Sequence, residues 1–469
     1  MREFSPELFG SGPWNNTTTV HPIGLLMVIA LGLALLLLPR RHAVVPMLIM
    51  ACFVAPAQRI VILGADFDFL RILVLFGWLR LAMRRETEGF RWMAMDKVIL
   101  CWAASAVVLN TLSQGSVDAL VNRLGYAFDA LGMYFLFRCL IRGWDDLNYT
   151  IQAFAVISVP VAIAFLIESQ TGRNAFSIFG GVPEITMVRN DRLRCQGAFS
   201  HPILAGCFWA SVLPLMAAQW WQGAARRTLA GVGCVMAVVI ILCCASSTPV
   251  SAVCIAAAGA CFYFLRHQMR TVRWALAGTL LLLHFVMNQP VWHLLARVDF
   301  VGGSTGYHRY WLINKAVENF GDWWLCGTAH AESWDPGAPY IDITNHYVLE
   351  GVRGGLLTLA LLIALISLAF RSAGYLGAAV ERQRDKSVLA WALGVAVLVH
   401  TTNYLAISYF GQIIMVWYLH LAMVTSLYAA VVPARQPVRA RAATAGRPMV
   451  AAPVSPGRRG PHATPGVTS

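Results

Sequence analysis

Long apolar runs alternate with short polar segments along most of this chain. The runs fall at approximately 20–38, 44–63, 67–83, 97–112, 123–141, 149–167, 201–221, 229–245, 250–265, 274–288, 345–370, 388–404 and 411–431. A helix needs about 20 mainly apolar residues to cross the hydrocarbon core of a bilayer. The pattern therefore predicts an all-α polytopic membrane protein with about 12 to 13 transmembrane helices.

Two polar intervals are much longer than the others, at 168–200 and 288–344. We expect both to be external loops that carry function, because binding residues concentrate on loops. The second contains GYHRYWLINKAVENF, whose spacing of apolar residues predicts an amphipathic helix.

The intervals suggest a division of the chain into N-terminal helices, a catalytic part with both loops, a C-terminal hairpin and a tail. The corresponding ranges are 1–167, 168–370, 371–431 and 432–469. The tail is rich in Pro, Ala and Arg, a composition typical of disorder.

Composition supports a membrane protein, since 58% of the residues are hydrophobic and only 13% are charged. A soluble globular protein of this size is far less apolar. The formal net charge of +13 does not indicate nucleic acid, because the basic residues sit mainly in alternate short loops and in the tail. By the positive-inside rule these loops and the C-terminus are cytoplasmic. We therefore expect a multi-pass protein of the inner membrane with its active site on the periplasmic, external face.

The stretch DITNHYVLEGVRGGLL, 342–357, places ionisable groups at the mouth of a long apolar helix. With a helix start near Asn345, His346, Glu350 and Arg353 follow at steps of four and three and share one face. Ionisable groups at such a place indicate a functional site by default. The alternative is a polar helix cap at the membrane interface.

Arginines are unexpectedly frequent in the two external loops. They are Arg173, Arg189, Arg192 and Arg194 in the first loop, and Arg297 and Arg309 in the second. A guanidinium offers a fixed fork of donors that matches phosphate, so the pyrophosphate of a membrane-embedded donor is a natural partner. The alternative is that long loops escape the positive-inside bias.

Three segments carry a resemblance to a known family. They are RCQGAFSHPILAG (194–206), STGYHRYWLINKAVENFGDWWLCGTAH (304–330) and TNHYVLEGVRGGLLTL (344–359). Together they resemble the O-antigen ligase and polymerase family. The resemblance implies a membrane-embedded, GT-C-like glycosyltransferase whose donor is an undecaprenyl-pyrophosphate-linked glycan. It also implies that the acceptor is a glycan or lipid, and that no metal or cofactor takes part.

By motif match, Arg194 and Arg309 look like the pyrophosphate-binding arginines, and His346 looks like the residue that assists the acceptor hydroxyl. Further candidates for the substrate site are Asn345, Tyr347, Glu350, Arg353, His308, Trp311, Arg297 and His201.

The segment ASSTPVSA at 245–252 departs from the commoner family pattern, because a charge expected there is absent. The sequence DITNHY followed by VRGG also departs from it and favours exopolysaccharide polymerases over core ligases. We expect inverting polymerisation of lipid-linked repeat units, with membrane lipids and chain-length or export proteins as partners. The alternatives are a ligase for a lipid or protein acceptor, and a transporter or flippase of lipid-linked glycans.

Two weaker signals remain. Asp66 and Asp68 in GADFDFLR offer hard oxygen ligands for a divalent ion, but the preferred interpretation is a turn partnered by Arg59 or Arg71. A second hypothesis is a disulfide between Cys195 and Cys326, which would tie the two external loops together.

Overall fold

The computed structural model describes residues 17–62, 64–297, 306–334 and 342–432. The predicted disordered tail, apart from Val432, lies outside the described residues, as does Ser304 of the second motif. Residues up to Val431 belong to one compact unit.

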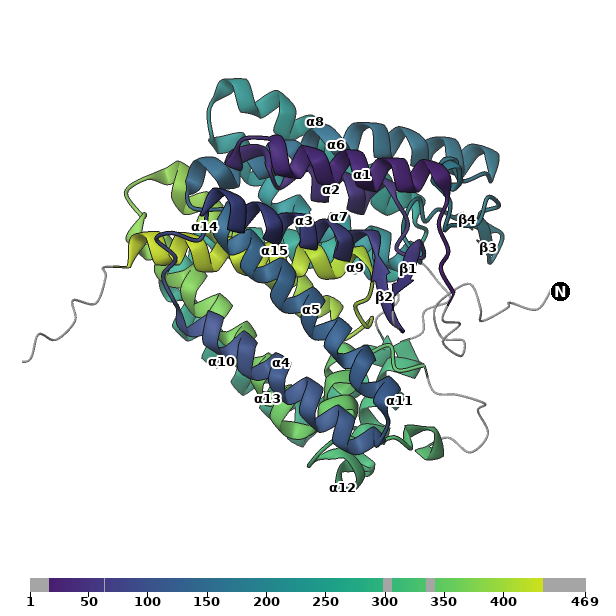
Figure 1. Cartoon of the computed structure of the whole chain (residues 1–469). Helices are drawn as coiled ribbons and strands as arrows, with labels where there is room; N and C mark the ends of the chain where they lie inside the picture. The colour runs from purple at the N-terminus through teal and green to yellow at the C-terminus, as the bar shows by residue number, and fades with distance from the viewer. Residues whose placement is uncertain (1–16, 63, 298–305, 335–341, 433–469) are drawn as a thin grey trace, which may run out of the picture. The chain divides into compact units, whose positions relative to one another are not determined.

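Helices dominate the described residues (Figure 1). The α-helices are α1 (Pro22–Leu37), α2 (Val45–Phe53), α3 (Phe69–Arg84), α4 (Ala94–Gln114), α5 (Val117–Leu140), α6 (Trp144–Thr171), α7 (Pro202–Ala218), α8 (Ala224–Cys243), α9 (Ser247–Cys261), α10 (Met269–Val286), α11 (Gly306–Glu318), α12 (Phe320–Trp323), α13 (His346–Ala379), α14 (Arg384–Asn403) and α15 (Gln412–Val431). The 3₁₀ helices that concern the site are η5 (Phe262–Gln268) and η6 (Val291–Arg297). Two short antiparallel hairpins complete the fold, β1 (Arg59–Ile62) with β2 (Ala65–Asp68), and β3 (Met187–Arg189) with β4 (Arg192–Arg194).

Seven helices of the described chain are long and apolar enough to cross a membrane, α9 to α10 being counted as one run. The protein is thus an all-α polytopic membrane protein, as predicted, but the expected 12 to 13 spans exceed this number. Two differences have clear causes. The apolar run 44–63 forms the nine-residue α2, about 14 Å long, followed by a β-hairpin. The runs 250–265 and 274–288 follow one another through η5 as one helical stretch, Ser247–Val286.

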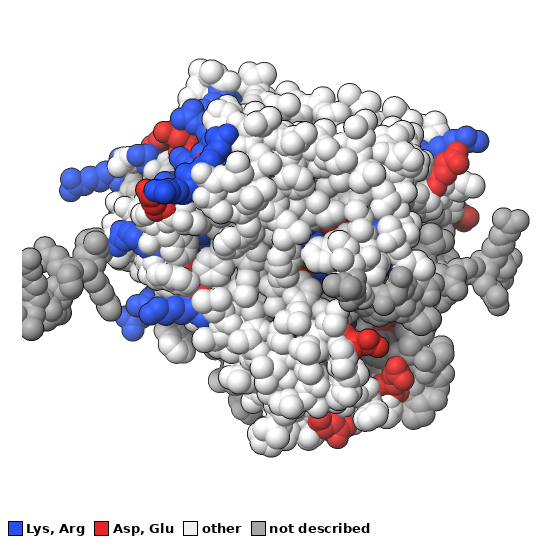
Figure 2. Space-filling model, in the orientation of Figure 1, with Lys and Arg blue, Asp and Glu red and all other residues white. Residues whose placement is uncertain are grey.

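Contacts between distant loops place the predicted basic segments at one end of the helices. Arg40 pairs with Asp146 at 2.8 Å, and Arg142 donates to the backbone oxygen of Glu86. Arg266 lies 3.9 Å from Glu381. Figure 2 shows the same trend, since Lys and Arg gather at one end of the visible face and an uncharged surface follows. This clustering agrees with the sidedness of the loops that the positive-inside rule predicts, while their cytoplasmic location stays a prediction.

A buried ion pair joins the helices around the site. Arg138 of α5 donates to Asp96 of α4 at 3.0 Å and to Ser426 of α15 at 3.1 Å. Both charged side chains are almost fully buried. Because breaking such a pair leaves an uncompensated charge, this contact fixes α4, α5 and α15 relative to one another.

The helix α13 bends sharply at Gly355, where the backbone has φ 69° and ψ −177°. In a straight helix His346 and Leu362 would be about 24 Å apart. Here both line one small cavity, so the arm 346–354 folds back along the arm 356–379. Hydrogen bonds from the long loop brace the bend on both sides, from Leu356 N to Trp324 O at 2.8 Å and from Thr328 N to Val352 O at 2.7 Å. The sequence had suggested one uninterrupted helix over 345–370, and that prediction is wrong.

Candidate functional site

Arg194 stands at the end of the β3–β4 hairpin, just before α7. The turn residues Asn190 and Asp191 have φ values of 51° and 56°, as a tight hairpin turn requires. The Arg194 residue is only 5% exposed, and its buried Nε has no hydrogen-bond partner. Within the described residues its guanidinium makes neither a hydrogen bond nor an ion pair. Burial, with a contribution from Arg189, lowers the pKa of Arg194.

Glu168 fixes the backbone that follows Arg194. Its carboxylate accepts hydrogen bonds from Gln196 N, Gly197 N and Thr186 Oγ1, all at 3.1 Å. Three donors on one carboxylate hold the loop closely, so Glu168 has a positioning role.

Arg309 reaches the same corner from the long external loop. It lies on α11, is 8% exposed, and its Nη2 donates to Thr248 Oγ1 at 2.8 Å. Thr248 belongs to the first turn of α9, next to Pro249, and a Cβ on Gly206 of α7 would lie 2.4 Å from Pro249 Cγ. This close approach of α7 and α9 sets Arg309 beside the start of α7. Arg297, the other arginine predicted in this loop, is exposed on η6.

An open cavity of about 710 Å³ lies between the β3–β4 hairpin and the α8–α9 turn. Its lining includes Asp191, Arg192, Cys243 and Ser246. Arg194 follows Arg192 and Leu193, which line this cavity, and it interacts electrostatically with Cys244. The volume is in the range of small-molecule sites.

His201 caps α7 through a hydrogen bond that depends on its protonation. Its Nδ1 accepts from Ile203 N at 3.1 Å, which requires a free lone pair. Burial, and then the charges of Arg194 and Arg189, lower the pKa of His201 to about 4.

We expect this cap to weaken in acid. The folded pKa of His201 is below the ordinary value near 6.5, so its contribution is complete above pH 6.5 and is lost as the pH falls towards about 4. Replacing His201→Asn keeps a capping side chain that does not titrate. Melting temperatures between pH 4.5 and 7.5 should therefore fall more steeply for the wild type than for the variant. Parallel curves would contradict the capping role.

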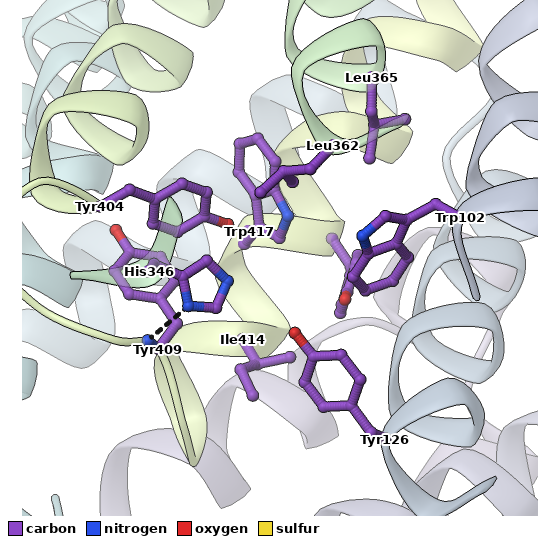
Figure 3. A pocket seen from close by; sticks show the side chains of 10 residues that line it. Trp102, Tyr126, His346, Leu362, Leu365, Tyr404, Tyr409, Ile414 and Trp417 are labelled. Carbon is purple, nitrogen blue, oxygen red and sulfur yellow. Dashed lines mark hydrogen bonds between the residues drawn. The ribbon is translucent and has the colours of Figure 1, made fainter. Parts of the chain in front are cut away.

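The second group of predicted residues lies at the start of α13, near His346. Figure 3 shows the His346 ring beside Tyr404 and Tyr409. The helix begins near Asn345, as the sequence predicted, and Asn345 caps it by accepting from Val348 N at 3.1 Å. His346 is 3% exposed; its Nδ1 accepts from Tyr409 N at 3.2 Å, and its Nε2 lies 3.9 Å from Glu350 Oε1. A backbone amide always donates, so in the neutral ring Nε2 carries the proton. In this conformation the protonated Nε2 lies near Glu350 but, at 3.9 Å, beyond hydrogen-bond distance.

Glu350 is equally enclosed. Its two oxygens accept from Trp102 Nε1 and Tyr126 Oη, both at 3.1 Å. The cavity between these side chains and His346 measures about 10 Å³, room for about one water molecule. A sugar does not fit there in the described conformation, so the role of His346 in accepting a proton stays a prediction.

The remaining predicted residues fall around these two groups. Tyr347 donates to Thr401 O at 2.9 Å, and His308 stacks on Trp311 with ring centroids 5.8 Å apart. Arg353 is exposed. No described hydrogen bond or ion pair joins His346 to Arg194 or Arg309.

Four residues of the hydrogen-bond network around Glu350 and Arg353 were not predicted. They are Trp102 and Asn110 of α4 and Arg123 and Tyr126 of α5. They lie in the apolar runs 97–112 and 123–141, which were interpreted from the sequence only as membrane-spanning helices. Arg123 alone gave a signal, since an ionisable residue inside a span is a functional candidate.

Asp66 and Asp68, the weaker candidate for a metal site, both have partners close by in the chain. Asp66 lies 3.5 Å from Arg59, and Asp68 caps α3 by accepting from Arg71 N at 2.8 Å. These contacts agree with the turn. Burial, with Asp129 nearby, raises the pKa of Asp68 to about 6.

The disulfide hypothesis is wrong in this structure. Cys195 and Cys326 are both free thiols. Cys195 is buried against α8, where its N donates to Cys243 O at 3.1 Å, while Cys326 lies beside the bend at Gly355.

No family model matches this chain, and no curated protein matches it. The resemblance to O-antigen ligases and polymerases therefore stays a prediction from the three motifs.

Proposed function

We propose that this protein is a membrane glycosyltransferase that polymerises undecaprenyl-pyrophosphate-linked repeat units on the external face of the inner membrane. The observation that carries the proposal is the buried guanidinium of Arg194, which has no partner in the described part of the chain. A buried cation without a counter-charge is costly, and an anionic ligand at this place would remove that cost.

A pyrophosphate suits the surroundings of Arg194. The helix α7 begins eight residues after Arg194, and a helix N-terminus favours negative charge. Arg309 brings a second guanidinium to the corner. Lipid pyrophosphate is a good leaving group, so the catalyst has to neutralise charge more than it has to donate a proton.

Glycosyl transfer at this site would form one bond and break one. The acceptor hydroxyl oxygen bonds to the anomeric carbon, the bond from that carbon to the pyrophosphate oxygen breaks, and the lipid pyrophosphate leaves as an anion held by arginines. The hydroxyl proton passes to a base. For His346 to be that base, its Nδ1 must first lose the hydrogen bond from Tyr409 N.

A transporter of lipid-linked glycans is the second candidate, because two observations favour it. The α13 helix is broken at Gly355, and His400 lies 3.0 Å from His420 deep in α14 and α15. Broken helices and buried ionisable residues are typical of transporters.

The test is reconstitution of the purified protein in liposomes with a fluorescent undecaprenyl-pyrophosphate repeat unit. A ladder of longer glycans on gels supports polymerisation. Movement of the label across the bilayer without new glycosidic bonds supports the transporter and contradicts the proposal.

Arg309→Lys should lower the rate of product formation by about 10-fold or more, because an ammonium keeps the charge but loses the fork geometry. The matched control is Arg297→Lys in the same loop, where the side chain is exposed and the rate should stay at the wild-type value. Initial rates in the liposome assay measure both. Equal rates for the two variants would remove Arg309 from the site.

A further inference from the structure

A single amide of α4 joins two arginines that the donor site does not use. Asn110 Oδ1 accepts from Arg123 Nε at 3.0 Å, and Asn110 Nδ2 donates to the backbone oxygen of Arg353 at 3.0 Å. The two residues come from α5 and α13, so three helices converge at this point.

Arg123 is built into this place yet keeps its terminal nitrogens available. It is 7% exposed, and its guanidinium carbon lies 5.4 Å from the centre of the Tyr126 ring. Among the described residues, Asn110 is its only side-chain hydrogen-bond partner, and neither Arg123 nor Arg353 forms an ion pair.

The local charge is positive. Arg123 and Arg353 interact electrostatically with each other and with Glu350. Both oxygens of that carboxylate accept hydrogen bonds from Trp102 and Tyr126. Two guanidiniums beside one carboxylate, which is already hydrogen-bonded, give a net positive charge. A bound anion would neutralise it.

Each of the three helices also carries an exposed leucine close in sequence to Asn110, Arg123 or Arg353. Leu112 on α4 and Leu124 on α5 are 67% and 51% exposed, and Leu357 on α13 is 55% exposed. Arg123 lies about 9 Å from the start of α5. An anion with a hydrocarbon chain fits this combination better than a free ion does, because the chain can lie on the apolar surface.

We propose that Arg123 and Arg353 form a second phosphate site, which holds the pyrophosphate head group of a second polyprenyl lipid. The assignment of that lipid as the acceptor rests on the function proposed above. It predicts that donor and acceptor are both lipid-linked, as polymerisation of repeat units requires.

The experiment counts undecaprenyl pyrophosphate molecules bound to the full chain by native mass spectrometry, in phosphatidylcholine nanodiscs. The wild type should bind two. Arg353→Gln changes an exposed side chain and should fold normally, yet it should weaken one of the two binding events at least 10-fold, as should Arg123→Gln. Arg173→Gln, whose exposed side chain pairs with Glu184, is the control and should still bind two.

Each result decides between the proposals. Two undiminished binding events in both Arg123→Gln and Arg353→Gln would overturn the second site. If phosphatidylglycerol at equal concentration displaces one molecule in the wild type but none in Arg353→Gln, the site takes ordinary phospholipid and the acceptor assignment fails. If Arg194→Gln still binds two while Arg353→Gln binds one, the second site stands and the proposed donor site fails.

Discussion

Arg194→Gln should nearly abolish product formation while leaving the protein at least as stable as the wild type. The loss should be about 10²-fold or more, the usual effect of removing a group that stabilises developing charge. Stability should not fall, because the substitution removes a buried cation that has no partner in the described residues. Rates in the liposome assay and melting temperatures in detergent measure the two effects.

Arg173→Gln provides the matched control in the same loop. The side chains of Arg173 and Glu184 are 76% and 64% exposed, and they form an ion pair at 3.2 Å. Exposed pairs of this kind contribute little, so rate and melting temperature should both stay near the wild type. A variant of Arg194 that works normally would remove Arg194 from the donor site, and one that unfolds would show that its guanidinium has a structural role.

Gly355→Ala should destabilise the protein strongly. The backbone conformation at Gly355 is almost confined to glycine and costs other residues about 1–3 kcal/mol. An added Cβ would also lie 2.4 Å from the backbone oxygen of Leu325, so the bracing loop would have to move. We expect a lower melting temperature and loss of glycan transfer together.

The control lies on the same helix. At Gly374 a Cβ would meet no atom within 4 Å, and alanine is the better helix former. Gly374→Ala should therefore match or slightly exceed the wild-type melting temperature. If Gly355→Ala behaves in the same way, the bend is not a required feature of the folded protein.

Local patterns predicted the features that depend on a few neighbouring residues. The helix start near Asn345, the helix over Gly306–Glu318 and the shared end of the basic loops all follow from short segments. The bend at Gly355 does not, because its direction depends on backbone groups of Trp324 and Thr328. The sequence VRGG permits the bend, but contacts with a distant loop determine it.

Local sequence patterns also could not predict which distant residues meet around Glu350 and Arg353. Arg123 and Asn110 lie at or within apolar runs, and only the packing of α4 and α5 against α13 brings them to Glu350 and Arg353. Similarly, β1 was assigned to the spanning run 44–63 because apolar residues of a short strand and of a helix have the same composition.

The bend of α13 has a consequence for biogenesis. The arm 346–354 is less than half the length that a segment needs to cross a bilayer, so it cannot be recognised as a span when it leaves the ribosome. Non-helical backbone at membrane depth is tolerated only when protein covers it, and here α4, α14 and residues 324–328 provide that cover. The arm must therefore fold into place after these segments are present. Assembly of the His346 pocket is then a late, post-insertion event, and a chain arrested before α14 should leave this arm accessible to protease.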